Sequence, residues 1–178
     1  MSERALFALL AQYNESMNLK LYAVAGQLSA EQLVEDKGAF FGSLIGTLNH
    51  ILAGDTIWLQ RFAQHPARYS SLEPIRMMPP PASLTAIFST DLSVLSVQRV
   101  KLDAITNALV AQVTEGELQQ VVPYKSMMGV PSRKRFSSLL LHFFNHQTHH
   151  RGQASTLLFQ AGVDIGVTDL LLTIPNEE

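Results

Sequence analysis

Four of the six histidines in this chain lie between His142 and His150, at a spacing that can build a metal site. The surrounding residues predict a helix, in which each residue turns about 100° around the axis. His142, His146, His149 and His150 therefore share one face, and leucines on that face predict that it is buried. Neutral imidazole is the commonest protein metal ligand, and an i,i+4 pair lies about 6 Å apart at Cβ. We interpret the cluster as part of a metal centre.

The spacing leaves open which histidines bind. His142/His146 and His146/His150 are both i,i+4 pairs, and His149 could join His146 at i+3. The zinc-protease pattern is excluded, because Gln147 rather than glutamate follows His146. Neutral imidazoles with open coordination positions favour zinc or nickel, with iron or manganese as alternatives, and metal supply decides among ions of similar affinity.

Two histidines on one helix need a third ligand from a facing helix. His50 is the candidate, since it lies in mid-helix on a face shared with Gly46 and Gly54. Such small neighbours leave room for another backbone or an ion. A lone helical histidine is more often packed or hydrogen-bonded, but beside the cluster the metal interpretation is favoured. His65 precedes Pro66 in a predicted loop, where we expect a solvated side chain.

The composition narrows the class of protein. The chain has 178 residues, 47% hydrophobic and 16% charged, which predicts one globular domain over residues 1–178. A net charge of −2 without a basic run argues against nucleic-acid binding. We expect no signal peptide and no membrane span. There is no cysteine, so a disulfide or a cysteine nucleophile is excluded, and a reducing cytoplasm is the expected compartment.

Hydrophobic periodicity predicts an all-α fold, a four-helix bundle with a short β-hairpin before the last long helix. A brief helix capped by Ser29 follows the first long one. Three consecutive prolines make residues 65–83 a connector. The hairpin is expected at 118–125 and 131–136. The four long helices are expected at 3–27, 42–64, from 84 or 91 to 114, and 137–160.

Several polar residues on these helices require an interpretation. Asp55 falls within an apolar sector, where a carboxylate is costly without a partner, and Arg151 is the preferred partner. Asn14 and Asn18 are expected on the surface of the first helix. Asn145 and Gln153 could hold histidine ring nitrogens. The expected buried stripe of the first helix is Leu6, Leu9, Leu10, Tyr13, Met17, Leu21 and Val24.

The chain also resembles a known family over nearly its whole length. Residues 145–153 read Asn-His-Gln-Thr-His-His-Arg-Gly-Gln, and Leu48-Asn49-His50 and Trp58-Leu59 precede them. The segments 13–18 and 38–43 fit the same pattern. This combination resembles the DinB (DNA-damage-inducible) family, within the DinB/YfiT-like superfamily of metalloenzymes. The resemblance implies an up-down bundle of unusual connectivity, commonly a homodimer, with a divalent metal held by His50, His146 and His150.

The resemblance further implies a chemistry. The wider superfamily includes metal-dependent transferases that use low-molecular-weight thiols, bacillithiol or mycothiol, among them a maleylpyruvate isomerase. A bound metal lowers the pKa of a thiol, so that the nucleophilic thiolate forms at neutral pH. In a chain without cysteine the thiol has to arrive as a cosubstrate, together with a small-molecule substrate. The alternatives are a non-catalytic metal-binding stress protein and a dimeric interaction module.

Overall fold

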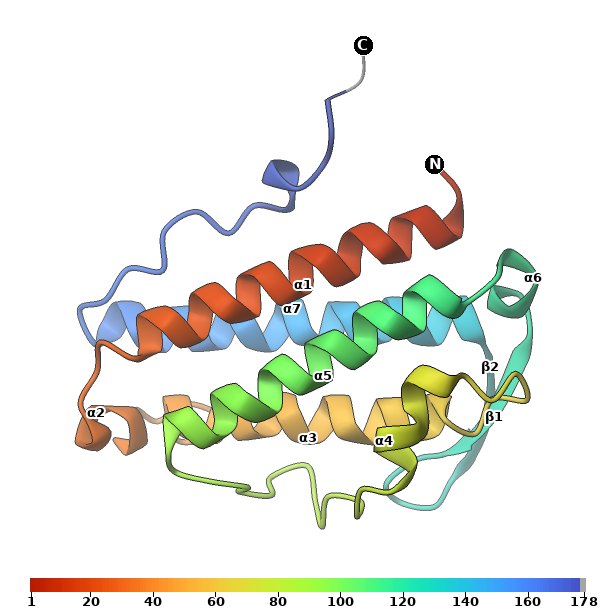
Figure 1. The fold of residues 1–178 in the computed structure, drawn as a ribbon. Coiled ribbons are helices and arrows are strands. Elements are labelled where there is room, and N and C mark those ends of the chain that lie inside the picture. Colours follow the sequence, from red (N-terminus) through yellow and green to blue (C-terminus); the bar gives the residue numbers. More distant parts are fainter. Residues whose placement is uncertain (177–178) are drawn as a thin grey trace.

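Four long helices dominate the computed structural model, which describes residues 1–176 (Figure 1). They are α1 (Glu3–Ala25), α3 (Leu44–Phe62), α5 (Leu92–Gln112) and α7 (Phe136–Gln160). Their number and order confirm the predicted bundle. Helix α1 packs against α5 and α7, and α3 packs against the same two helices.

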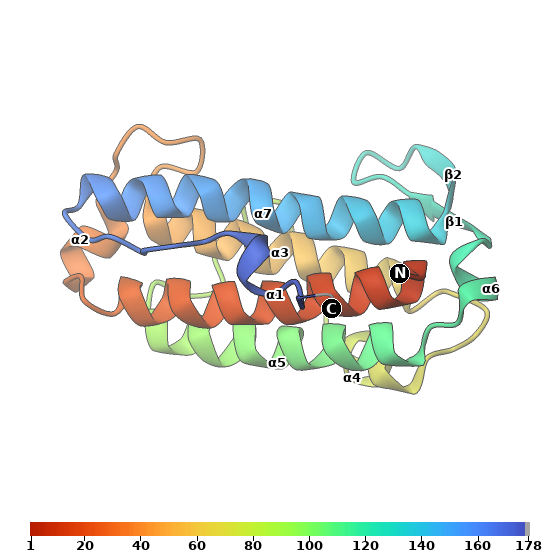
Figure 2. The same ribbon diagram turned by 90° about the horizontal axis from the view of Figure 1, so that it is seen from above.

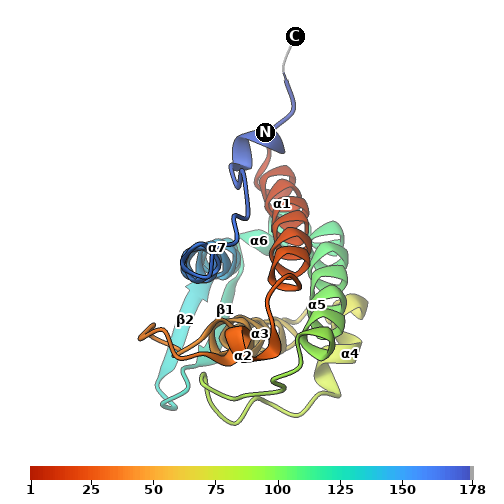
Figure 3. The same ribbon diagram turned by 90° about the vertical axis from the view of Figure 1, so that its left-hand side faces the viewer.

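The connectivity departs from a simple up-down order. Seen end-on, α1 lies across the bundle from α3, and α5 lies across from α7 (Figure 3). Helices α3 and α5 run in the same direction, opposite to α1 and α7 (Figure 1). Parallel neighbours need a long return connection, which residues 63–91 supply. The pairing that matters for the histidines is that of α3 with α7.

Short elements complete the bundle. The hairpin of β1 (Val121–Lys125) and β2 (Pro131–Arg135) pairs Val121 with Arg135 and leads directly into α7, as predicted. It and the loop before α3 project from the same side of the α3–α7 pair, at opposite ends (Figure 2). The remaining short helices are α2 (Ala30–Val34), η1 (Ser70–Leu72), α4 (Glu73–Arg76), α6 (Glu115–Leu118) and η2 (Leu170–Leu172).

Local signals explain where the helices begin. Ser43 accepts a hydrogen bond from the Gly46 N–H and so caps α3. The preceding Gly42 has a φ of +73°, outside the right-handed helical region, so the helix cannot extend back through it. Asp91 caps α5, so the alternative start of that helix at Leu84 is wrong. The predicted connector is not free of helix, since η1 and α4 precede its prolines.

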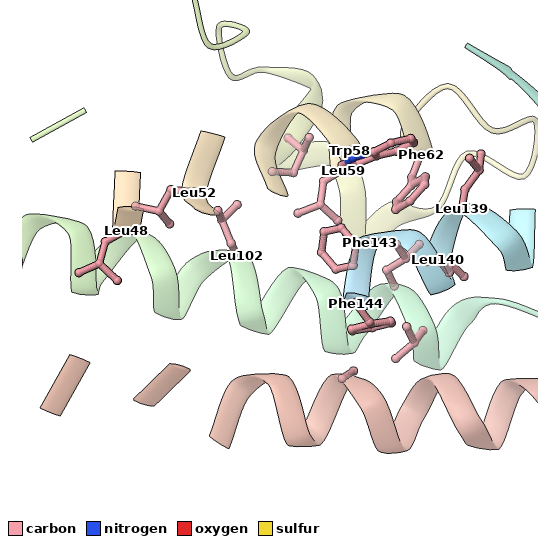
Figure 4. Close-up of a cluster of buried hydrophobic side chains, with 14 of the residues drawn as sticks. Leu48, Leu52, Trp58, Leu59, Phe62, Leu102, Leu139, Leu140, Phe143 and Phe144 are labelled. Carbon is pink, nitrogen blue, oxygen red and sulfur yellow. The ribbon is translucent and has the colours of Figure 1, made fainter. Parts of the chain in front are cut away.

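The apolar core takes buried side chains from all four long helices, α1, α3, α5 and α7. Toward the hairpin end, Phe62 of α3 packs edge-on against Phe143 of α7, which in turn contacts Phe144 (Figure 4). Burial of each such side chain stabilises the fold by about 1.5–3 kcal/mol. Within the described part of the chain, no helix has both the length and the apolar character that crossing a membrane requires.

The predicted stripe of α1 has the wrong phase. Of its seven members Leu21 is buried, Leu6 is 40% exposed and the other five are half-buried. Polar side chains take part of the buried face instead, because they belong to a hydrogen-bonded network described below. The buried residues of α1 are Phe7, Ala11, Asn14, Asn18, Leu21, Tyr22 and Ala25.

Candidate metal centre

Three histidine rings from two packed helices meet at the α3–α7 contact. One ligand atom from each of His50, His146 and His150 lies within 4.8 Å of the others. The ring centroids are 4.3 Å apart for His50 and His150, and 4.3 Å apart for His146 and His150. His146 and His150 are one helical turn apart on α7, so both project toward α3. Within residues 1–176 no further His, Asp or Glu belongs to this group.

Hydrogen bonds fix the proton positions on two of these rings. The Nδ1 of His50 lies 2.7 Å from the Leu84 carbonyl oxygen, and the Nδ1 of His150 lies 2.7 Å from Oε1 of Gln153. Both oxygens can only accept, so each Nδ1 carries the hydrogen and donates it. The Nε2 of each neutral ring is then left with a lone pair.

Those two lone pairs face each other. The Nε2 atoms of His50 and His150 are 3.1 Å apart. Two lone pairs at this distance repel unless a proton or a cation lies between them. Burial lowers the pKa of both rings, which disfavours the proton. Two imidazole nitrogens on one tetrahedral zinc ion lie about 3.3 Å apart, so the donor set fits a divalent cation.

His146 completes the group from α7, one helical turn before His150. Its burial, followed by the charges of His150 and His50, lowers its pKa to about 3, so this ring is neutral near pH 7. Its buried Nδ1 has no hydrogen-bond partner among residues 1–176. The ring lies against Gly54, where an added Cβ would be 2.7 Å from Cε1. An orphaned ring nitrogen beside two facing lone pairs is consistent with a site shaped for a cation.

An aromatic ring covers one side of the group. Phe41 stacks on His50 at 3.9 Å between centroids and lies edge-on to His150 at 5.5 Å. Glycine at position 46 lets this loop come close, because a Cβ there would clash with the Phe41 carbonyl oxygen. The expectation that small neighbours of His50 leave room is confirmed: Gly46 admits Phe41, and Gly54 admits His146.

The other histidines have separate roles. His142 and His149 are exposed, so the expectation that four imidazoles share one buried face is wrong. His142 instead packs against Trp58 at 4.9 Å. The expected solvated loop position of His65 is also wrong, since its ring is 1% exposed and lies 4.9 Å from the Phe136 ring.

The two amides predicted to hold ring nitrogens differ. Gln153 accepts the hydrogen bond from His150, as predicted, and so orients a ring of the candidate centre. Asn145 is exposed and makes no such contact. One helical turn, from His150 to Gln153, is what places the amide within reach.

A buried charge network lies beside the histidine group. Arg99 of α5 pairs with Asp55 of α3, and its Nη2 lies 2.9 Å from Oδ1 of Asp103. Burial raises the pKa of Asp55 to about 6, with Arg99 opposing the shift. Asn18 donates to Asp103 at 2.9 Å and to Oε1 of Gln147 at 3.3 Å. Gln147 follows His146, so the network contacts the helix segment that carries His146 and His150.

Two predictions about this network are wrong. The partner of Asp55 is Arg99, whereas Arg151 donates to Asn14, Asn18 and Gln147. Asn14 and Asn18 are each 1% exposed instead of lying on the surface. A sequence signal for Arg99 existed, because it follows Leu95 by four residues and so falls on the apolar stripe of its helix.

The metal-free protein is expected to lose stability as the pH falls from about 6.5 toward 3. An unfolded histidine binds a proton near pH 6.5, whereas folded His146 does so only near pH 3. The contribution of His146 to the free energy of unfolding is therefore complete above pH 6.5. It falls below that pH by at most about 1.4 kcal/mol per pH unit. Urea unfolding with a chelator, at about pH 7 and about pH 5.5, measures the slope. His146→Gln should flatten it, and an unchanged slope would contradict the assignment.

Comparison with known proteins agrees with this architecture. The model of the DinB family matches residues 1–178. The chain is also similar to a crystal structure of a DinB-like protein from Bacillus cereus, with 19% identity, a TM-score of 0.61, and coverage of 88% of this chain and 91% of that chain. Similarity at this identity establishes the fold alone. A comparison with curated proteins found no match.

Proposed function

This chain belongs to the DinB family, and from its three-histidine group we propose that it binds a divalent metal ion through His50, His146 and His150. The observation that carries the proposal is the 3.1 Å approach of the Nε2 atoms of His50 and His150, each with its Nδ1 hydrogen already donated elsewhere. These two nitrogens would both hold a bound cation, which would remove their mutual repulsion. Zinc and nickel are the proposed ions, with iron and manganese as alternatives.

We further propose that the centre serves a thiol-dependent transferase. A bound divalent cation would supply a Lewis acid that lowers the pKa of a coordinated thiol. The thiol and a small-molecule substrate have to come from solution, because the chain has no cysteine. His50 and His150 are oriented by Leu84 and Gln153, and Phe41 shields one side from water. The group offers three protein ligands, which leaves a position for a substrate, whereas a structural zinc site uses four.

His50→Ala or His150→Ala is expected to abolish stoichiometric metal binding. Removing one of three ligands takes away a donor that no neighbouring side chain replaces within the described residues. Protein purified without an affinity tag is loaded with zinc or nickel, desalted and measured by elemental analysis. His149→Ala is the matched control, since His149 is exposed on the same helix, and His65→Ala tests a buried histidine outside the group. Metal retained in both ligand variants would refute the site.

Transferase activity needs its own test. Zinc-loaded protein is incubated with bacillithiol or mycothiol and an electrophilic acceptor, and the consumption of free thiol is followed. Activity that disappears in His50→Ala and persists in His149→Ala supports the transferase. Stoichiometric metal with no thiol consumption would favour a non-catalytic metal-binding protein.

Compartment and assembly stay predictions. We propose a cytoplasmic location, since histidine ligands and a free thiol cosubstrate suit a reducing environment. We also retain the homodimer, because the chain has only 16% charged residues and exposes several large apolar side chains.

A further inference from the structure

A half-buried cation without an acidic partner lies on the same face of α3 as His50. The Arg61 guanidinium is 4.5 Å from the Trp58 ring centroid and 5.2 Å from that of Tyr124. Within residues 1–176 it forms no ion pair, whereas the buried Arg99 of α5 has two carboxylates. Aromatic rings occupy the faces of a stacked guanidinium and leave its N–H edges free.

Those edges lie at a cavity of about 270 Å³ between α3, the proline connector and the hairpin. Its polar lining includes Arg61, Lys125, Gln64 and Ser126, and no carboxylate. Ile57 and three prolines supply an apolar wall. Two cations over an apolar floor suit an organic acid, because a carboxylate accepts two parallel hydrogen bonds from one guanidinium. Burial lowers the pKa of Arg61, and an anion would relieve the cost of that burial.

The cavity and the histidine group lie along one face of α3. His50, Gly54, Ile57 and Arg61 follow at spacings of four, three and four, so they share one face of α3. Arg61 lies about three helical turns beyond His50, about 16 Å along the axis. Between centroids, the ring of His142 lies 4.9 Å from that of Trp58 and 6.1 Å from that of His146.

We propose that this cavity binds a carboxylate of the thiol cosubstrate or of its acceptor, with Arg61 as the principal anion-binding residue and Lys125 as the second. The proposal rests on the proposed function for its ligand, but the cavity itself needs no metal. An elongated organic acid held at Arg61 extends along α3 toward the histidines. The proposed substrate class is therefore an elongated organic anion, long enough to reach from Arg61 toward the histidines.

Trp58 is the only tryptophan in the chain and Arg61 stacks on its ring, so its fluorescence responds to binding at Arg61. Wild-type protein, metal-free and zinc-loaded, is titrated with succinate at constant ionic strength, with neutral succinamide as the uncharged comparison. Broadening of the succinate methylene NMR signal gives a second readout that does not depend on the stacking of Arg61. We expect saturable binding of succinate and none of succinamide.

Arg61→Gln is expected to weaken succinate binding at least about tenfold, and Lys125→Gln by less. Lys134→Gln is the matched control, because Lys134 is exposed on the same hairpin and does not line the cavity. Arg61 is also the basic residue in the last turn of α3. A purely helix-stabilising role would lower the urea midpoint of Arg61→Gln and leave succinate affinity unchanged, which overturns the proposal. Absence of saturable binding in the wild type overturns it as well.

The two proposals fail separately. Arg61→Gln should keep the metal stoichiometry of the wild type, and His50→Ala should keep its succinate affinity. Metal retained in the histidine variants with succinate binding lost in Arg61→Gln would refute the metal ligands and support the cavity. The reverse pattern would refute the cavity alone.

Discussion

Replacing Arg99 with methionine is expected to destabilise the folded protein by about 3–5 kcal/mol near pH 7. The Arg99 guanidinium is 2% exposed and is the cation that contacts both Asp55 and Asp103, whose side chains are 0% and 2% exposed. Methionine preserves much of the apolar stem but leaves two carboxylates buried without that cation. Truncating one member of a buried charge network costs more than the intact network contributes, because the remaining charges have lost their hydration.

Urea unfolding monitored by far-ultraviolet circular dichroism measures this loss. Glu73→Gln is the control, since it removes the acid of the Arg76–Glu73 pair, where the Glu73 side chain is 66% exposed. A surface pair contributes about 0–1 kcal/mol, so this variant should unfold close to the wild type. A loss below about 1 kcal/mol in Arg99→Met would mean that solvent already reaches the two carboxylates.

The pH dependence distinguishes lost charge from lost packing. Without Arg99 the folded-state pKa of Asp55, already raised to about 6 by burial, rises further above its unfolded value of 3.8. The folded variant then holds a proton that the unfolded chain releases. Its deficit against the wild type is full above the folded pKa and shrinks as the pH falls through it. A packing defect would show the same deficit at both ends of this range.

The long helices could be predicted from sequence because their boundaries are local. Ser43 and Asp91 cap α3 and α5 through contacts two or three residues away, and Gly162, with a φ of +83°, follows the last turn of α7. Such signals need no knowledge of the rest of the fold. The antiparallel hairpin followed in the same way from the turn that includes Gly129, whose φ is +77°.

The order of the helices in space could not be predicted from periodicity. A stripe reports which side of a helix is apolar but not which helix faces it, and α3 and α5 run in the same direction only because a long connector returns the chain. Only the resemblance implied unusual connectivity. The same limit explains the wrong phase of α1, since Asn14 and Asn18 are polar and yet belong to the core face.

The candidate site was predictable to the extent that its spacing lies within one helix. His146 and His150 converge because residues four apart share a face. His142 satisfies the same spacing and is excluded only by tertiary structure, which packs it against Trp58 at the hairpin end. His50 required a facing helix, and the glycines beside it were the local clue. The Leu84 carbonyl that orients its ring comes from an irregular connector without a sequence pattern.

Charge pairing was the least predictable part of the structure. Asp55 was identified as a carboxylate that needs a partner, but Arg151 and Arg99 are chemically equivalent candidates in a sequence. The choice between them depends on which guanidinium projects toward α3. Arg99 does so from α5, whereas Arg151 points to α1 and donates to Asn14 and Asn18. The positions of both follow from the helix order, which periodicity does not supply.

Gly54→Ala is expected to reduce metal affinity by about 10- to 100-fold, a loss typical of removing a group that positions a ligand. The new Cβ would lie 2.7 Å from Cε1 of His146, so the ring has to move away from His50 and His150. In an otherwise unconstrained helix the same substitution stabilises by about 1 kcal/mol, because alanine favours helix over glycine. A variant that is destabilised and also binds metal weakly therefore identifies a specific steric conflict with His146.

A double-mutant cycle tests that conflict directly. In the His146→Ala background the imidazole is gone, so Gly54→Ala should become neutral or stabilising, and the two effects should not add. Urea unfolding of all four proteins in chelator measures the coupling free energy, and zinc titration of the two proteins that retain His146 measures the affinity. Gly152→Ala on α7 is the matched control, since nothing lies within 4 Å of a Cβ there. If Gly54→Ala has the same effect with and without His146, glycine at this position serves the helix contact between α3 and α7 rather than the placement of a ligand.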